Sequence, residues 1–400
     1  MPPLATRFCR LPGHAQRCAP LPARALLLAL LLAWGPARAE NYLFPGNLPL
    51  GCSASGGSSN STYICLGLTL GAGDTIRLGA ATATATTITV NGPLKTGLLS
   101  RINPGASATR LNLVVTGTTS LGENAILNAN LAGGGAITTG ANSSVVGNLT
   151  TVAGVINIGA HGTVVGALKT DSAAINTGNF SSITGAITST IAGVVTIGAD
   201  SNVVGNITTA SGAINIGARS HIDGTITSLI AGAITVGADA KVTGGVATTY
   251  HGSDIGAGAI TLEDNVEVKG AVATYTGAIT SGTNSKVSGS VSSNDGAITV
   301  GDDADVGGAV CTGNSGAITV GTRTNVGGNI ETALAGAITV GNLSNVTGAV
   351  TVRGAGARTI ATDAKTGSMI GSSCGAAAPK TAPPVAFRIK ARQWRQLFMR

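Results

Sequence analysis

One sequence unit repeats along most of the chain, and this repetition limits what the chain can fold into. The unit reads Gly-Ala-Ile-Thr-Val-Gly, four variable residues and then Val-x-Gly-x-Val-x-Thr. Its copies start at Gly135, Gly154, Ala173, Gly193, Gly212, Gly232, Gly258, Gly277, Gly296, Gly316 and Gly336, with a weaker copy at Gly356. From Gly135 to Gly336, successive starts differ in residue number by 19, 19, 20, 19, 20, 26, 19, 19, 20 and 20. A fixed period near twenty, rich in glycine and β-branched residues, is typical of a solenoid.

The columns of the repeat predict which side chains are buried. With the opening residue as position 0, position 2 is Ile or Val in every copy from Gly135 to Gly336, and positions 4 and 10 are mostly aliphatic. Because side chains alternate along a strand, these positions should point inward and position 3 outward. We predict an all-β, single-stranded parallel β-helix (a β-solenoid), right-handed, with about 19–20 residues per coil. About twelve coils of two short strands each are expected from the repeats.

Charged residues indicate the register between coils independently. Opposite charges recur one coil apart at position 7 (Asp200, Arg219, Asp239, then Asp303, Arg323) and at position 9 (Lys241, Glu267, Lys286, Asp305). Strands stacked in register place such side chains next to each other, which favours alternating signs. Exposed pairs of this kind contribute little to stability individually.

Composition and charge exclude several classes of protein. Sixty glycines and 3% aromatic residues do not suit an ordinary globular core, and 43% hydrophobic residues with 10% charged residues do not suit a disordered chain. The formal net charge of +7 is concentrated at the two ends. Residues 40–384 contain 14 basic and 17 acidic residues, a net charge of −3. We therefore expect no nucleic-acid partner.

Residues 1–39 read as a signal peptide. Arginines precede an apolar run from Ala25 to Trp34, and Ala37-Arg38-Ala39 is a cleavage signal, so the mature chain would begin at Glu40. The apolar run is too short to span a bilayer, and we predict no transmembrane segment. The expected location is therefore outside the cytoplasm: the periplasm, the outer surface or the medium.

Four cysteines remain after the leader. Cys52 and Cys65 flank a Ser/Gly-rich loop, and we predict a disulfide between them, since exported proteins retain such bonds. Cys311 and Cys374 either pair or stay separate, because their spacing does not decide between these states.

The remaining segments divide by composition. Residues 40–134 are expected to form an N-terminal cap of irregular coils, and residues 135–374 the regular solenoid. An Ala/Pro-rich linker (375–386) and a basic tail (387–400) follow. The long step from Gly232 to Gly258 predicts a loop that leaves the solenoid at residues 250–257.

No catalytic arrangement is evident in the sequence, and we expect neither enzymatic activity nor a cofactor. The densest acids are Asp302, Asp303 and Asp305, near Glu263, Asp264 and Glu267 two coils away. Such oxygen ligands suit calcium, but the nonapeptide of calcium-binding β-rolls is absent, so solvated turn acids are the favoured interpretation and no metal site is predicted. His161 and His221 lie three coils apart and form no cluster.

The outward positions of the first strand form the candidate binding face. Position 1 is usually Ala and position 3 usually Thr or Asn, which predicts a flat, uncharged surface containing Thr138, Thr196, Thr235, Thr261, Thr299, Thr319 and Thr339. This face would suit lateral self-association, a carbohydrate or ice. The alternative is that short side chains simply fit a tightly coiled strand.

The alternating Gly-Ala-Ile-Thr-Val-Gly and Val-x-Gly-x-Val-x-Thr segments resemble the polymer-forming solenoids of the bactofilin group. The leader, the Cys52…Cys65 opening and Leu68-Thr-Leu-Gly-Ala-Gly-Asp74 more closely resemble the N-terminal solenoid of MshQ-type proteins. Those are encoded with mannose-sensitive haemagglutinin pilus systems and continue into a large C-terminal domain, whereas this sequence ends after the basic tail.

These features lead to one functional expectation with two alternatives. The resemblance implies an exported structural or adhesive surface protein, associated with pilus biogenesis. Its partners would be further copies of itself, cell-surface or pilus components, or glycans. The alternatives are a carbohydrate- or ice-binding module and, less favoured, a carbohydrate-active enzyme.

Overall fold

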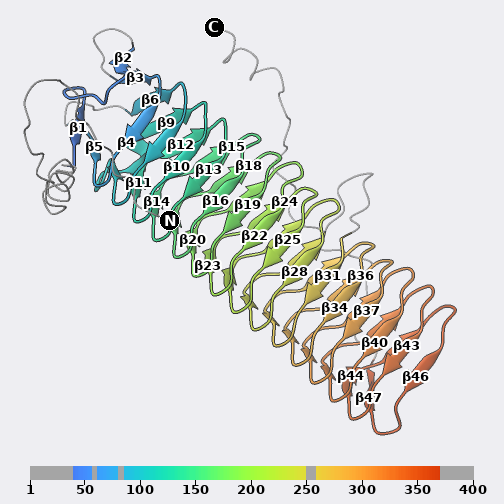
Figure 1. Cartoon of the computed structure of the whole chain (residues 1–400). Coiled ribbons are helices and arrows are strands. Elements are labelled where there is room, and N and C mark those ends of the chain that lie inside the picture. Colours follow the sequence, from blue (N-terminus) through green and yellow to red (C-terminus); the bar gives the residue numbers. More distant parts are fainter. Residues whose placement is uncertain (1–38, 56–60, 80–84, 249–257, 370–400) are drawn as a thin grey trace, which may run out of the picture. The chain divides into compact units, whose positions relative to one another are not determined.

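A computed structural model describes residues 39–55, 61–79, 85–248 and 258–369, which belong to one compact unit beginning at Ala39. Almost every element in these residues is a β-strand, and a short 3₁₀ helix, η1 (Ala108–Arg110), lies among them. The strands stack, almost all in parallel, into three long sheets (Figure 1). The predicted all-β solenoid is confirmed, and its regular strands recur at the spacing of the sequence repeat.

The three sheets run along the whole stack. Sheet 1 has 15 strands: β4 (Leu68–Leu70), β7 (Leu94–Thr96), β10 (Thr119–Leu121), β13 (Ile137–Thr139), β16 (Ile156–Ile158), β19 (Ile175–Thr177), β22 (Val195–Ile197), β25 (Ile214–Ile216), β28 (Ile234–Val236), β31 (Ile260–Leu262), β34 (Ile279–Ser281), β37 (Ile298–Val300), β40 (Ile318–Val320), β43 (Ile338–Val340) and β46 (Arg358–Ile360).

Sheet 2 has 16 strands: β1 (Asn41–Phe44), β5 (Thr75–Leu78), β8 (Arg101–Ile102), β11 (Ile126–Asn128), β14 (Ser144–Val146), β17 (Thr163–Val165), β20 (Ser182–Thr184), β23 (Asn202–Val204), β26 (His221–Asp223), β29 (Lys241–Val242), β32 (Glu267–Val268), β35 (Lys286–Val287), β38 (Asp305–Val306), β41 (Asn325–Val326), β44 (Asn345–Gly348) and β47 (Lys365–Met369).

Sheet 3 also has 16 strands: β2 (Cys52–Ala54), β3 (Thr62–Cys65), β6 (Thr86–Val90), β9 (Leu111–Val115), β12 (Asn130–Gly133), β15 (Leu149–Thr151), β18 (Leu168–Thr170), β21 (Ile187–Ser189), β24 (Ile207–Thr209), β27 (Ile226–Ser228), β30 (Val246–Thr248), β33 (Val272–Thr274), β36 (Val291–Ser293), β39 (Val310–Thr312), β42 (Ile330–Thr332) and β45 (Val350–Val352). The stack thus extends beyond the regular repeats at both ends.

Each regular coil contains three strands, so the prediction of two was wrong. The expected second strand, positions 9 to 16, is divided by a bend at the position-12 glycine. Gly166 shows why the bend occurs: its φ is +152°, and a Cβ there would lie 2.2 Å from the carbonyl oxygen of Gly147 in the preceding coil. Only glycine allows the backbones of successive coils to approach so closely while the chain turns.

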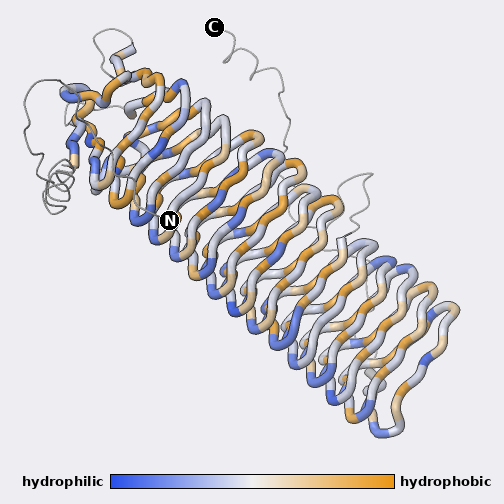
Figure 2. Tube along the Cα trace, in the orientation of Figure 1, coloured by the Kyte–Doolittle hydropathy of each residue, from blue (hydrophilic) through white to orange (hydrophobic). Residues whose placement is uncertain are grey.

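The core consists of stacked aliphatic columns inside the coil. Every position-2 side chain of the regular repeats is at most 1% exposed, as the alternation predicts, and positions 10 and 14 supply the facing columns from sheets 2 and 3. Figure 2 shows hydrophobic residues recurring along the coils, with hydrophilic segments gathered at turns along one edge. Each coil therefore buries its apolar side chains and pairs its backbone only with neighbours above and below.

Position 7, in the turn between sheets 1 and 2, adopts left-handed backbone geometry in successive coils. The residues there have φ between +54° and +60° and are Asn142, His161, Phe180, Asp200, Arg219, Asp239, Asn265, Asn284, Asp303, Arg323 and Leu343. Non-glycine residues rarely adopt this conformation, and Asn and Asp are the types that favour it. The stack therefore imposes this turn on side chains as unsuited to it as Phe and Leu.

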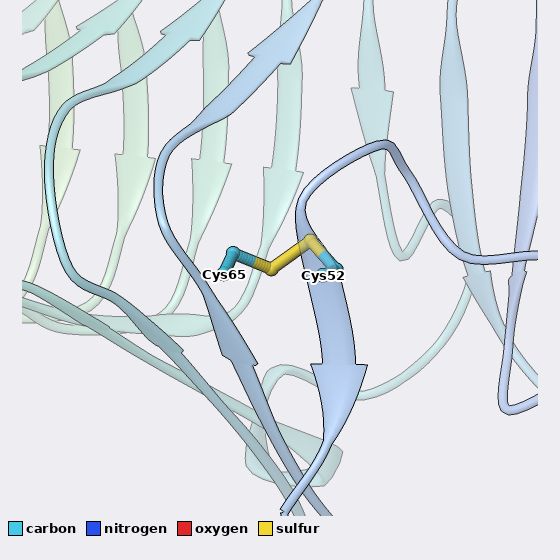
Figure 3. Close-up of a disulfide and its surroundings, with 2 residues drawn as sticks. All are labelled: Cys52 and Cys65. Atoms are coloured by element: carbon cyan, nitrogen blue, oxygen red, sulfur yellow. A yellow bond between two sulfur atoms is a disulfide. The ribbon is translucent and has the colours of Figure 1, made fainter.

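The N-terminal end of the stack differs from the rest. Strand β2 runs antiparallel to β3, and a disulfide joins Cys52 to Cys65, as predicted (Figure 3). The rings of Phe44 and Tyr63 meet edge to face, with centroids 4.8 Å apart, and both side chains are fully buried. This end therefore combines a covalent bond with a buried pair of aromatic rings.

Several predicted features fall outside the described residues. These are the signal peptide up to Arg38, the loop at 250–257, the Ala/Pro linker, the basic tail and Cys374. Cys311 on β39 is disulfide-bonded. Among the described residues, no helix has the length and apolar character needed to cross a bilayer.

Candidate functional site

The seven predicted face residues lie in one column on the outer surface of sheet 1. Each is the central residue of its strand, flanked by inward-pointing neighbours, and each is exposed or half-buried. Register pairing links them without a break, through Asn157, Asn176, Asn215 and Thr280. The sequence pattern therefore placed these side chains on one face correctly.

The C-terminal half of this column contains only threonine. Seven threonines follow one another in paired register: Thr235, Thr261, Thr280, Thr299, Thr319, Thr339 and Thr359. Thr280 and Thr359 were not among the predicted face residues. Both occupy position 3 of their units, so the same periodicity identifies them. Adjacent strands are about 4.8 Å apart, which sets the spacing of the hydroxyls.

A column of alanines lies two residues before the threonines. Its members are exposed and are Ala233, Ala259, Ala278, Ala297, Ala317, Ala337 and Ala357. We call these alanines, together with the seven consecutive threonines, the Ala/Thr face. Its residues carry no charge and no titratable group.

The chemistry of this face is that of an ordered array of hydroxyls and methyls. A threonine hydroxyl both donates and accepts hydrogen bonds, and its β-branched side chain has few χ1 rotamers. The array is thus held by the backbone before any ligand arrives, which lowers the entropy cost of binding. In the N-terminal half, asparagines are interspersed with threonines, and Asn176 Nδ2 donates to Asn157 Oδ1 at 2.9 Å. A repetitive, uncharged partner matches this pattern best.

The acidic residues noted in the sequence serve the turns and the ladders between coils. Asp264 Oδ1 accepts from the backbone N–H of Thr283 at 2.8 Å, and Asp302 Oδ1 accepts from that of Thr322 at 2.7 Å. Glu263 Oε2 likewise accepts from the backbone N–H of Ala238, at 3.0 Å. No group of three or more His, Cys, Asp or Glu side chains in the described part of the chain has the arrangement of a metal site.

Charged side chains on neighbouring coils pair as their spacing predicts. Arg219 meets Asp200 and Arg323 meets Asp303, each at 2.6 Å, and Lys241 lies 3.5 Å from Glu267. Hydrogen bonding to Arg323 lowers the pKa of Asp303, and Arg219 does the same to the pKa of Asp200. Register pairing also places Glu267 beside Lys286 and Lys286 beside Asp305. These pairs confirm the predicted register.

The two histidines noted in the sequence lie on different coils and have different neighbours. His161 stacks on Phe180 of the next coil, with ring centroids 4.9 Å apart and planes within 5°. His221 lies on β26, where register pairing places it beside Lys241. The structure therefore does not bring them together.

Comparison with known proteins adds no assignment to this geometry. No family model, no curated protein and no solved structure matches the chain.

Proposed function

We propose that the chain is an exported, non-catalytic β-solenoid scaffold with a structural or adhesive role at the cell surface. Its partners in this proposal are further copies of itself or surface components, and the resemblance to MshQ-type solenoids suggests an association with pilus biogenesis.

The unbroken register of the Ala/Thr face supports this proposal most. The same short side chains recur over seven consecutive strands of sheet 1, from Thr235 to Thr359. Such a surface repeats a weak contact many times, so binding to another repetitive surface gains strength from multiplicity. Asp264, Asp302 and Asp303 serve turns and ladders, and His161 stacks on a neighbouring ring.

The assembly state of the purified mature chain tests the structural role. Negative-stain microscopy and analytical ultracentrifugation should show filaments or laterally associated oligomers. A variant with lysines at Thr280, Thr299 and Thr319 should lose lateral association, because the Ala/Thr faces of two associating copies would then carry like charges and repel each other. The matched control places lysines at Thr188, Thr208 and Thr227, which are stacked outward positions of sheet 3. A wild-type chain that stays monomeric at high concentration would contradict the structural role.

The regular hydroxyl array also supports a second candidate, a binding module for a carbohydrate or ice. Adsorption to insoluble polysaccharides and to growing ice crystals distinguishes these ligands. The three-lysine variant should lose adsorption while its melting temperature stays near that of the wild type. Adsorption that survives these substitutions would exclude the Ala/Thr face as the binding surface.

A further inference from the structure

The backbone nitrogen of Glu40 lies against a buried carboxylate. It donates to Asp74 Oδ1 at 2.8 Å, and the second oxygen, Oδ2, accepts from the N–H of Gly71 at 2.6 Å. Asp74 is only 7% exposed. Both oxygens therefore have N–H donors, while the described contacts give this carboxylate no cationic partner.

The position of Glu40 is fixed by the sheet. Its carbonyl oxygen accepts from the N–H of Thr75 at 2.8 Å, and the next residue, Asn41, pairs in register with Thr75 as β1 stacks on β5. Asp74 immediately precedes β5. The distance between the Glu40 nitrogen and the Asp74 carboxylate is thus set by backbone pairing.

The same nitrogen is the one that signal-peptide cleavage would release. The Ala37-Arg38-Ala39 signal places the scissile bond between Ala39 and Glu40, and the compact unit begins at Ala39. Hydrolysis adds water across this amide: the hydroxyl goes to the carbonyl carbon of Ala39, and the Glu40 nitrogen gains a proton and becomes an amine. At neutral pH that amine carries a second added proton and a positive charge.

We propose that cleavage after Ala39 creates an ion pair between the α-ammonium of Glu40 and the carboxylate of Asp74, which fastens the first strand of sheet 2 to the stack. The proposal rests on the proposed export. Cleavage turns the neutral amide donor of Glu40 into a charged donor at the same position. The buried carboxylate of Asp74 thereby gains a counter-ion without rearrangement of the fold. Charge-assisted hydrogen bonds are shorter and stronger than neutral ones, so processing should strengthen this end of the solenoid.

The ion pair makes the stability of the N-terminal end depend on pH. A carboxylate at this distance raises the pKa of the α-ammonium above its ordinary value of about 8. The stabilisation is then present at neutral pH, where both groups are charged, and is lost as the pH rises from about 8 through the higher pKa of the ammonium in the folded state. The charged and titratable groups on the strands involved, apart from the pair itself, are the Glu40 side chain, Tyr42, Arg77 and Arg101. Hydrogen bonding to the Glu40 side chain raises the pKa of Tyr42 to about 12, so Tyr42 stays neutral in this range.

The first experiment maps the N-terminus of the exported full chain by mass spectrometry. Glu40 as the first residue supports the cleavage. A different first residue would contradict both the cleavage and the ion pair. If Glu40 is the first residue but its amine is not protected from the acylating reagent of the second experiment, the ion pair is wrong. The proposed export would still stand in that case.

The second experiment measures how fast an acylating reagent modifies the Glu40 amine between pH 7 and pH 10. The wild-type amine should react several-fold more slowly than that of Asp74→Asn, and the control Asp239→Asn should behave as the wild type does.

A variant with one glycine inserted between Ala39 and Glu40 keeps the Asp74 carboxylate but moves the ammonium away. Its amine should react as quickly as that of Asp74→Asn, and its melting temperature should fall by a few degrees at pH 7 but not at pH 10. Equal reactivity in wild type and both variants would overturn the ion pair.

Discussion

At the scale of single residues, inward and outward positions of one strand have opposite requirements. Ile234 is fully buried on β28 and pairs in register with Ile214 and Ile260, so aliphatic side chains enclose it along the stack. The next residue, Thr235, points to solvent. Neighbours in the chain therefore tolerate very different substitutions.

Replacing Ile234 with Asp should destabilise the solenoid by at least about 3 kcal/mol, because the carboxyl group would enter the core without a partner. The control Thr235→Asp should cost less than about 1 kcal/mol. Thermal melting followed by circular dichroism measures both variants. Equal melting temperatures for Ile234→Asp and the wild type would contradict the inward assignment.

The left-handed turn at position 7 predicts a stabilising substitution. Leu343 has φ +56° and is 61% exposed, so it adopts an unfavourable backbone geometry without core packing in return. Leu343→Asn should raise the free energy of unfolding by about 1 kcal/mol, since Asn accepts this conformation more readily. The reverse change at the equivalent site, Asn142→Leu, should lower it by a similar amount in denaturant titrations. A loss of stability in Leu343→Asn would show that its side chain contributes packing.

At the scale of elements, an interior strand is stabilised by backbone pairing with its equivalents in the two adjacent coils. A strand at the end of a sheet has only one such neighbour and benefits from an additional bond. Strand β2 lies at the end of sheet 3 and pairs with β3 alone. The disulfide between Cys52 and Cys65 closes the loop that connects these two strands. The N-terminal end of sheet 3 therefore relies on a covalent bond where interior strands of the sheet rely on two neighbours.

Replacing both Cys52 and Cys65 with Ser should lower the free energy of unfolding by about 3 kcal/mol, because the unfolded chain regains the freedom of the open loop. Denaturant titration measures the change. Ser53→Ala on the same strand serves as the control and should change little. A double variant as stable as the wild type would show that packing alone holds β2.

The ion pair between position-7 turns should have a small, pH-dependent effect. Hydrogen bonding to Arg323 lowers the pKa of Asp303 in the folded state, so the stabilisation is present above the ordinary carboxyl pKa and is lost as the pH falls through the lowered value. Asp303→Asn, which keeps the left-handed turn, should melt slightly below the wild type at pH 7 and together with it in strong acid. A difference that persists in acid would point to the turn geometry instead of the charge.

At the scale of the whole molecule, backbone pairing links each coil only to its immediate neighbours. A link between distant parts of the chain therefore requires another kind of bond, such as a disulfide. Cys311 is the central residue of β39 and points away from the core, yet it is only 7% exposed and is disulfide-bonded. Its neighbour in register, Glu331, is also buried and pairs with Arg353. The outer surface of sheet 3 is therefore covered at these coils.

We expect the partner of Cys311 to be Cys374, because the other two cysteines outside the Cys52–Cys65 bond, Cys9 and Cys18, lie in the predicted leader. Digestion without reductant, followed by mass spectrometry, should yield a linked peptide with both cysteines. Cys311 bonded to any other cysteine would contradict this pairing.

The repeat predicted much of the fold and of the candidate face because its signals are local. A burial pattern of period two identifies which side chains point inward, and the nearly constant repeat length places Thr138 and Thr339 in one column. The bend at Gly166 was missed, because glycine in a strand pattern leaves open whether the strand continues or turns. Its cause, the close approach of Gly147 from the coil before, exists only once the coils are stacked.

Periodicity and short spacing are enough to predict the solenoid class, the buried columns, the register of the charged residues and the Cys52–Cys65 bond. Three further features appear only in the folded stack: the three-sided coil, the left-handed turn at position 7 even at Phe180, and the contact of the Glu40 nitrogen with the distant Asp74. These features arise from contacts between one coil and the next. A stack of near-identical units fixes such contacts through backbone pairing, which side-chain patterns in one unit do not encode.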